Sequence, residues 1–91
     1  MTIPAGSRVL LFGRLKYFAP SGEIQICTSP EMTPQRFREA VARELTRKSP
    51  DFRVAKELAS CAVASGNRII SEGETLGVAT EFALLPPVCG G

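Results

Sequence analysis

The sequence predicts an α+β fold, in which a mixed sheet of four or five strands has one main helix across one face. Three observations predict it. A pair of apolar segments opens the chain, one amphipathic segment with helical spacing follows, and several short strand-like segments come after it. The expected order is therefore β-β-α-β-β-β, and 91 residues are enough for one domain. We expect this domain to span residues 1–85 and an extended tail to span residues 86–91.

The opening pair has the pattern of a hairpin. Arg8–Phe18 is rich in Val, Leu, Phe and Tyr, a composition typical of a strand that is buried on both faces. Gly13 interrupts this segment, where we expect a bulge. Ala19–Gly22 has the residues of a turn. Glu23–Cys27 then alternates polar and apolar residues, which places its two isoleucines on one face of a second strand.

The helical segment has clear boundaries. Thr33 can cap its first turn, and Pro34 suits the first helical position. Ser49 followed by Pro50 ends it. Apolar residues recur at helical spacing along one side, at Phe37, Ala40, Val41 and Leu45. Pairs of opposite charge four residues apart occupy the other side, namely Glu39–Arg43 and Glu44–Lys48.

The second half of the chain consists of short segments. Asp51–Ala59 is ambiguous, and we expect a loop that includes a short helical turn. Three strands are predicted after it, at Ser60–Ser65, Arg68–Ser71 and Thr80–Leu85. Gly66 and Asn67 form the turn between the first two. Glu72–Ala79 contains two glycines and is expected to be an irregular connection.

The composition excludes several classes of function. The chain is 44% hydrophobic and carries a net charge of +2, which is too balanced to indicate a nucleic-acid partner. Basic residues on the helix could contact an acidic partner, although a solvated helix face is the favoured interpretation. No apolar run reaches the roughly 18–20 residues of a membrane span, and the first residues lack a secretory signal. The three cysteines, Cys27, Cys61 and Cys89, form no CxxC pair, so we expect neither disulfides nor zinc, and a cytoplasmic compartment.

Side chains suited to catalysis are scarce. The chain contains no histidine, which removes Ser–His and Cys–His pairs and the commonest metal ligand. It also lacks the glycine-rich motifs that bind phosphate, and its acidic residues form no obvious pair. The remaining candidate for a reactive group is the carboxylate at the end of the chain.

The last residues, LLPPVCGG, are suited to such a role. Pro86 and Pro87 end the last strand at Leu85 and favour an extended path. Six residues from Pro86 onward could extend over roughly 18–20 Å, enough to enter the active site of another protein. Gly90 and Gly91 would fit a channel too narrow for other residues. The alternative is an inert frayed end.

This ending resembles that of the small subunit of molybdopterin synthase, the MoaD-type sulfur carriers. Their tails typically read as two apolar residues, Pro-Pro, an apolar residue, a small residue and Gly-Gly. The β-β-α-β-β-β order also resembles the ubiquitin-like β-grasp fold of that family. The opening segment VLLFGRLKYFA is similar to the first strand of the family in its apolar run and its final aromatic-Ala.

The resemblance implies a carrier without a bound cofactor or metal. An E1-like adenylating and sulfurtransferase enzyme would use ATP to adenylate Gly91, and sulfur would then convert it to a thiocarboxylate. The carrier would dock on the large synthase subunit, in a heterotetramer of two small and two large subunits. There it would donate sulfur to cyclic pyranopterin monophosphate, and two transfers would build the dithiolene of the molybdenum cofactor. No nucleic acid or membrane is implied as a partner.

The resemblance also implies a role for each tail residue. Gly91 carries the adenylate and then the thiocarboxylate, and the residues that enter the partner are Pro86, Pro87, Val88, Cys89 and Gly90. Leu85 is expected at the partner interface, whereas Phe82 and Leu84 alternate with it and are expected to face the core. The chain departs from the family at Leu76–Glu81, which lacks most of the acidic residues often found there. It also has Cys89 where many relatives have Ala, Ser or Gly, and a small residue that fits the channel is the favoured interpretation.

Three alternatives stay open. A related β-grasp carrier could serve thiamine synthesis, tRNA thiolation or cysteine synthesis, although the Pro-Pro pair favours molybdopterin. A ubiquitin-like modifier would need the same activation but would end as an isopeptide on lysine. A β-grasp binding module with an inert tail is the third.

Overall fold

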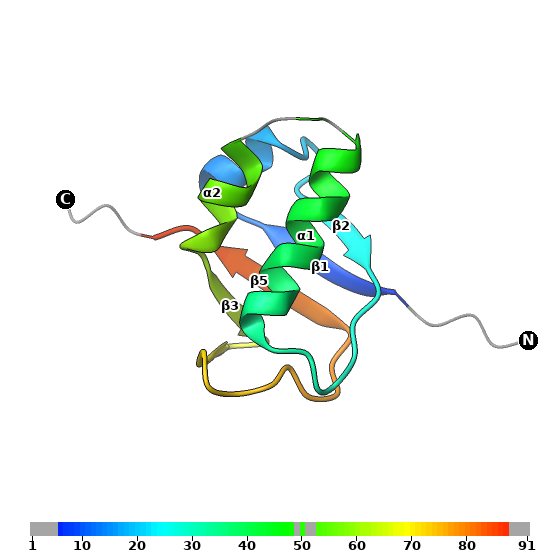
Figure 1. Ribbon diagram of the computed structural model, residues 1–91, viewed down its shortest axis with the longest axis vertical. Helices are drawn as coiled ribbons and strands as arrows, with labels where there is room; N and C mark the ends of the chain where they lie inside the picture. Colours follow the sequence, from blue (N-terminus) through cyan, green and yellow to red (C-terminus); the bar gives the residue numbers. More distant parts are fainter. Residues whose placement is uncertain (1–5, 49, 51–52, 88–91) are drawn as a thin grey trace, which may run out of the picture.

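The computed structural model describes residues 6–48, 50 and 53–87, and their five strands form one mixed sheet (Figure 1). The strands are β1 (Ser7–Leu11), β2 (Glu23–Ile26), β3 (Ala62–Ser65), β4 (Arg68–Ile70) and β5 (Glu81–Leu85). Their order across the sheet is β2-β1-β5-β3-β4. β1 runs antiparallel to β2 and parallel to β5, and β3 runs antiparallel to both β4 and β5. The predicted α+β class with a mixed sheet is therefore confirmed.

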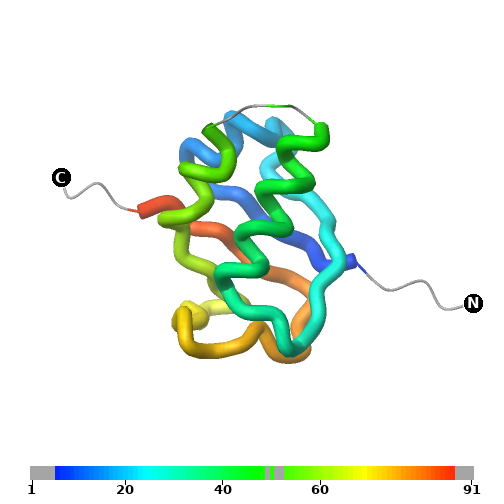
Figure 2. The backbone as a smooth tube through the Cα atoms, viewed as in Figure 1, coloured from blue at the N-terminus to red at the C-terminus, as the bar shows by residue number. Residues whose placement is uncertain are grey.

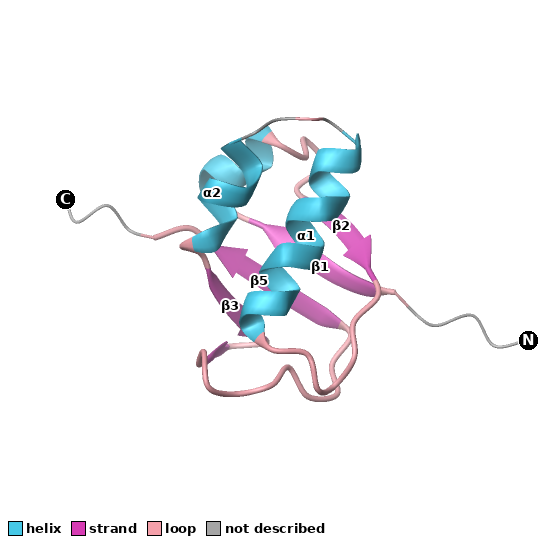
Figure 3. Cartoon of the chain, viewed as in Figure 1, coloured by secondary structure: helices cyan, strands magenta, loops and turns pink. Residues whose placement is uncertain are grey.

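The main helix, α1 (Pro34–Lys48), crosses one face of this sheet (Figure 3). Thr33 caps it as predicted, because its Oγ1 accepts a hydrogen bond of 3.2 Å from the backbone N–H of Arg36. On the solvated side, Glu44 pairs with Lys48 at 3.8 Å and more closely with Arg47 at 2.7 Å. Glu39 accepts a hydrogen bond of 3.4 Å from Gln35. No helix of the described residues is long and apolar enough to cross a membrane.

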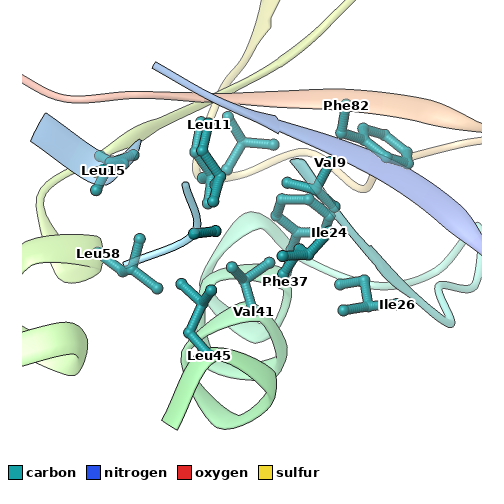
Figure 4. Packing of buried hydrophobic residues seen from close by; sticks show 14 of the residues in the cluster. Val9, Leu11, Leu15, Ile24, Ile26, Phe37, Val41, Leu45, Leu58 and Phe82 are labelled. Carbon is teal, nitrogen blue, oxygen red and sulfur yellow. The ribbon is translucent and has the colours of Figure 1, made fainter. Parts of the chain in front are cut away.

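The hydrophobic core lies between α1 and the sheet (Figure 4). Phe37, Val41 and Leu45 of α1 are buried and point toward the side chains of the strands, as the helical spacing predicts. The rings of Phe37 and Phe82 lie 5.1 Å apart between centroids, in a tilted arrangement. Full burial of a side chain of this size contributes about 1.5–3 kcal/mol. The pair therefore joins the first turn of α1 to the central strand β5.

The opening segment differs from the prediction of one strand, because β1 ends at Leu11 and a 3-10 helix, η1 (Gly13–Tyr17), follows. Gly13 has a φ of +59°, so the backbone turns out of the sheet instead of forming a bulge within it. The 3-10 helix places Leu15 in the core. The turn to β2 is closed as predicted, by a hydrogen bond of 2.8 Å from the N–H of Gly22 to the carbonyl of Ala19.

The prediction that this segment is buried on both faces is also wrong. Val9 and Leu11 are buried against α1, whereas Arg8 and Phe12 are exposed and Leu10 is half-buried. The reason is that the described helices lie over the same face of the sheet (Figure 3), and no described element covers the other face. Large apolar residues on that other face are therefore accessible, such as Phe12 and Ile69.

A second helix, α2 (Arg53–Ala59), occupies the segment whose prediction was ambiguous. It packs against α1 and buries Val54 and Leu58, which are four residues apart and so lie on one side of the helix. Two apolar residues give too weak a periodic pattern to distinguish a short helix from a loop. Tertiary packing therefore decides the conformation of this segment.

The connection between β4 and β5 is irregular, as predicted, but it is held in place by several contacts. Leu76 is buried, and its N–H donates a hydrogen bond of 2.8 Å to the carbonyl of Met32. Arg38 of α1 makes a two-pronged ion pair with Glu72, with N–O distances of 2.8 and 2.6 Å. The guanidinium of Arg38 also donates to the carbonyl of Cys61, at 3.3 Å. The helix therefore fixes the path that leads into the last strand.

Candidate functional site

The predicted tail leaves from the middle of the sheet. β5 lies between β1 and β3 and ends at Leu85, and Pro86 and Pro87 follow it. Figure 2 shows the last described residues, in red, leaving the sheet at the end of the molecule that carries α2. Val88, Cys89, Gly90 and Gly91 lie outside the described residues. Of the predicted tail, the structure thus describes only its first two residues.

Pro86 rests against the start of η1. It is half-buried, and a Cβ atom added to Gly13 would lie only 3.0 Å from its Cγ atom. Contacts this short require one of the two groups to move. The absence of a side chain at Gly13 therefore gives Pro86 its place and sets the direction in which the tail departs. The sequence identified Gly13 only as a break in a strand, because its neighbour in space is distant in the chain.

An apolar surface lies on the uncovered face of the sheet, beside Pro86 and Pro87, which we call the tail base. Leu10, Ala83, Ala64 and Ile69 face one another in register across four strands, β1, β5, β3 and β4. Phe12 is 42% exposed and Ile69 is 53% exposed. We define the outer-face patch as Leu10, Phe12, Ala64, Ile69, Ala83 and Leu85. A groove of about 230 Å³ runs along it, bounded also by Gly66 and Glu81.

Three predicted residues on the last strand can now be located. Phe82 and Leu84 are buried in the core, which confirms that part of the prediction. Leu85 alternates with them, is half-buried, and lines the groove of the outer-face patch. Leu10 and Phe12 belong to the same patch but were not singled out from the sequence. Their alternation with Val9 and Leu11 was the available signal, and the expectation of burial on both faces concealed it.

A charged group borders the patch at the end away from the tail. Arg8 and Glu81 are paired in register near the beginning of the parallel strands β1 and β5. The Nε of Arg8 lies 2.5 Å from Glu23 Oε2, and its Nη1 lies 3.4 Å from Glu81 Oε2. The hydrogen bond that Arg8 donates to Glu23, followed by the charge of Glu23, raises the pKa of Arg8. The outer-face patch therefore lies between a fixed ion-pair network and the tail base.

Of the two cysteines in the described part of the chain, Cys61 is poorly suited to be an alternative reactive centre. Cys61 is buried, and burial raises the pKa of its thiol, which disfavours the nucleophilic thiolate. Its Sγ donates a hydrogen bond of 3.2 Å to the carbonyl of Glu57. Cys27 is exposed and free. Within the residues that the structure describes, no three His, Cys, Asp or Glu side chains gather where they could hold a metal ion.

Comparisons with known proteins place the fold. No model of a protein family matches the chain, and no curated protein matches its sequence. Two crystal structures of the small archaeal modifier protein SAMP1 from Haloferax volcanii are similar to it, with TM-scores of 0.61 and 0.62, each at 22% identity. The matches cover 94% and 92% of this chain and 99% of each of those chains.

A third similar structure is a Pyrococcus furiosus protein, provisionally assigned as molybdopterin converting factor subunit 1. Its TM-score is 0.59 at 20% identity, and the match covers 92% of this chain and 99% of that one. All three similarities therefore extend over nearly the full length of both proteins. The chain has the ubiquitin-like β-grasp fold that its sequence predicts.

Proposed function

We propose that the chain is a sulfur-carrier subunit that works through a thiocarboxylate on Gly91. In this proposal Gly91 is the C-terminal residue of the working protein. An ATP-using enzyme transfers AMP to its carboxylate and releases pyrophosphate. Sulfide displaces AMP and gives the thiocarboxylate directly. A persulfide donor displaces AMP to give an acyl disulfide, and a thiol then attacks its S–S bond, which releases the thiocarboxylate and leaves the donor and that thiol joined as a disulfide.

One observation carries the proposal. A stiff Pro-Pro segment leaves the central strand directly beside an uncovered apolar face, and the sequence that follows ends in Cys-Gly-Gly. A partner that covers the outer-face patch would hold the body of the carrier through buried apolar area. The same contact would fix the starting point of the tail, so that less entropy is lost when the tail enters the partner. In this proposal the strand β5 contributes to the docking surface and leads directly into the first residues of the tail.

Molybdopterin synthase is the recipient that the chain supports best. The tail motif LLPPVCGG resembles that of the small synthase subunit, and one similar structure is provisionally assigned as a molybdopterin converting factor subunit. The outer-face patch would then be buried against a large synthase subunit, with Leu85 at the contact. Sulfur would pass from Gly91 to cyclic pyranopterin monophosphate in the active site of that subunit.

A ubiquitin-like modifier is the second candidate. Two of the similar structures are of a small archaeal modifier protein, and a modifier would use the same activated Gly91. The difference lies in the group that attacks: a lysine amine forms an isopeptide and releases AMP or a thiol. The fold and the tail serve both roles, so the products must distinguish them.

Intact-mass spectrometry can test the proposal. The purified chain is incubated with ATP, a sulfur donor and an activating enzyme from the native host. Replacement of one terminal oxygen by sulfur supports the carrier, whereas adducts the size of whole proteins support the modifier. An unchanged mass, under conditions in which the enzyme consumes ATP with a known substrate, would contradict both candidates.

Adding a large synthase subunit and the pterin precursor extends the experiment to the recipient. Formation of molybdopterin, together with return of the carrier to its carboxylate mass, is the expected result. A thiocarboxylated carrier that gives no product with a synthase subunit of proven activity would indicate a different recipient.

A further inference from the structure

A second surface lies beside the tail base, on η1 and α2. It is a pocket of about 530 Å³, and we call it the η1–α2 pocket. Its lining residues are Arg14, Lys16, Tyr17, Phe18, Arg53 and Glu57. Three of the six are cationic and one is anionic, so cationic side chains outnumber anionic ones in the lining. None of them belongs to the outer-face patch.

Aromatic rings form the apolar part of the pocket. Tyr17 is 73% exposed, an unusual position for a large ring, and Phe18 is half-buried beside it. The two rings meet edge to face, with 5.7 Å between their centroids. The guanidinium of Arg53 lies over the Tyr17 ring, 5.2 Å from its centroid. This stacking holds a positive charge and an accessible ring in one place.

The pocket is held rigid by contacts between its two elements. Arg14 of η1 lies 2.7 Å from Glu57 of α2, measured from Nε to Oε2. Leu15 and Leu58, which neighbour these two residues in sequence, are both buried in the core. The cations and rings are therefore presented by elements anchored in the fold, so that little order would be lost when a ligand binds.

The location of the pocket connects it to the tail. Arg14 directly follows Gly13, the residue against which Pro86 packs. In Figure 1, α2 lies at the end of the molecule from which the chain leaves after β5. Phe12 of the outer-face patch directly precedes Gly13. A protein that receives the tail would therefore have the η1–α2 pocket next to the point where it meets Pro86.

We propose that the η1–α2 pocket binds an acidic segment of a partner protein, in which Asp or Glu side chains flank an apolar or aromatic residue. The carboxylates would pair with Lys16 and approach the guanidinium of Arg53, the apolar residue would lie on Tyr17, and Arg14 would keep its ion pair with Glu57. That this partner is also the protein that receives the tail rests on the proposed function. The binding of an acidic segment does not depend on it. Charge pairs at such a rim add orientation and association rate more than affinity.

An NMR titration tests this with the full chain. The probe is the peptide acetyl-Asp-Glu-Phe-Asp-Glu-amide, and the matched neutral probe is acetyl-Asn-Gln-Phe-Asn-Gln-amide. We expect the acidic peptide to shift signals of η1 and α2, including the side-chain Nε–H signals of Arg14 and Arg53. Raised salt should weaken this binding, since the charges are exposed. The neutral peptide should give much smaller shifts at the same concentration.

Two charge reversals provide the matched comparison. Lys16 lies in the pocket and is exposed, so the fold should tolerate Lys16→Glu. We expect this variant to bind the acidic peptide about fivefold more weakly. Arg36→Glu makes the same change in charge in the first turn of α1, outside the pocket, and should leave the affinity unchanged. Equal weakening by both variants would show only a general charge effect and would overturn the proposal.

Titrations with other ligands can also contradict the proposal. If inorganic phosphate or ADP shifts the pocket signals and the acidic peptide does not, the pocket is a small-anion site and the proposal is wrong. The same holds if no probe shifts them at millimolar concentration. Neither result would affect the proposed function, because the mass test on Gly91 does not depend on this pocket.

Discussion

Gly13→Ala should change the direction of the tail while leaving the fold intact. The substitution adds a single methyl group at a residue that is exposed and lies outside the sheet. Two penalties follow from the structure. An alanine at a φ of +59° is strained, and its Cβ would lie 3.0 Å from the Cγ of Pro86. Because Pro86 is half-buried at the end of the last strand, it can yield by moving outward.

The free-energy cost of each penalty can be given separately. The left-handed conformation costs an L-residue about 1–2 kcal/mol. The contact with Pro86 adds about 1 kcal/mol if the proline moves only partly, by analogy with mild overpacking. A total of about 2–3 kcal/mol would lower the melting temperature of a domain this size by roughly 10–20 °C. A domain of ordinary stability would remain folded at room temperature.

Gly77→Ala is the matched control. Gly77 has a φ of +74°, in the same left-handed region as Gly13, but an added Cβ would meet no atom within 4 Å. It lies in the connection between β4 and β5, outside the groove of the outer-face patch, so its alanine variant has the conformational strain without the contact to Pro86. The difference in unfolding free energy between the two variants measures that contact. Pro86→Ala combined with Gly13→Ala removes the Cγ atom and should recover about 1 kcal/mol.

Denaturant unfolding and a thiocarboxylation assay read out the two effects. We expect Gly77→Ala to lose stability but to be converted to thiocarboxylate at the normal rate in the folded state. Gly13→Ala should be converted more slowly, because the tail starts from a displaced base. Equal conversion rates for both variants, or equal losses of stability, would refute the role of Gly13 in placing Pro86.

Two further predictions concern docking and pH. Leu85→Asp should weaken binding to the large synthase subunit about 100-fold in a titration, since an unpaired charge in a buried apolar contact costs about 3 kcal/mol. Val78→Asp is the control, because Val78 is 94% exposed in a loop outside the outer-face patch, and this variant should bind normally. Equal affinity of both variants would contradict a contact at Leu85. The hydrogen bond from Arg38 holds the pKa of Glu72 below its ordinary value of 4.5, so the unfolded chain binds the proton of this carboxyl group more tightly than the folded chain. The ion pair therefore stabilises the fold above about pH 4.5, and this stabilisation is lost as the pH falls through the lowered pKa. Thermal melts of Glu72→Gln should therefore vary less between about pH 5 and about pH 3 than those of the unchanged chain, and a parallel pH dependence would exclude this ion pair as a source.

The residues of α1 and β2 could be assigned from the sequence because local and tertiary preferences agree there. Thr33 and Pro34 suit a helix start, and the apolar stripe of α1 has the correct period for one buried side. The last strand was also assigned correctly, since Pro86 cannot continue the ladder of hydrogen bonds. In these elements the local pattern alone specifies the conformation.

The assignments that failed depend on contacts between distant parts of the chain. Arg8–Phe18 is apolar enough for one long strand, but the core needs Leu15 at a position that only the turn at Gly13 allows. The α2 helix forms because Val54 and Leu58 reach the core beside α1. The outer-face patch was missed for a similar reason, because a sequence pattern does not show which face of a sheet a helix will cover.

The central claim is that the reactive group is the carboxyl of Gly91, and one added residue tests it most directly. A variant with a single alanine after Gly91 would be compared with the unchanged chain in the thiocarboxylation assay, with the C-terminal peptide checked by mass so that trimming of the alanine is detected. We expect equal thermal stability, because the addition lies beyond the sheet and its core. We also expect no conversion of the extended chain to a thiocarboxylate. Sulfur incorporation at the unchanged rate, with the extra alanine still attached, would contradict it.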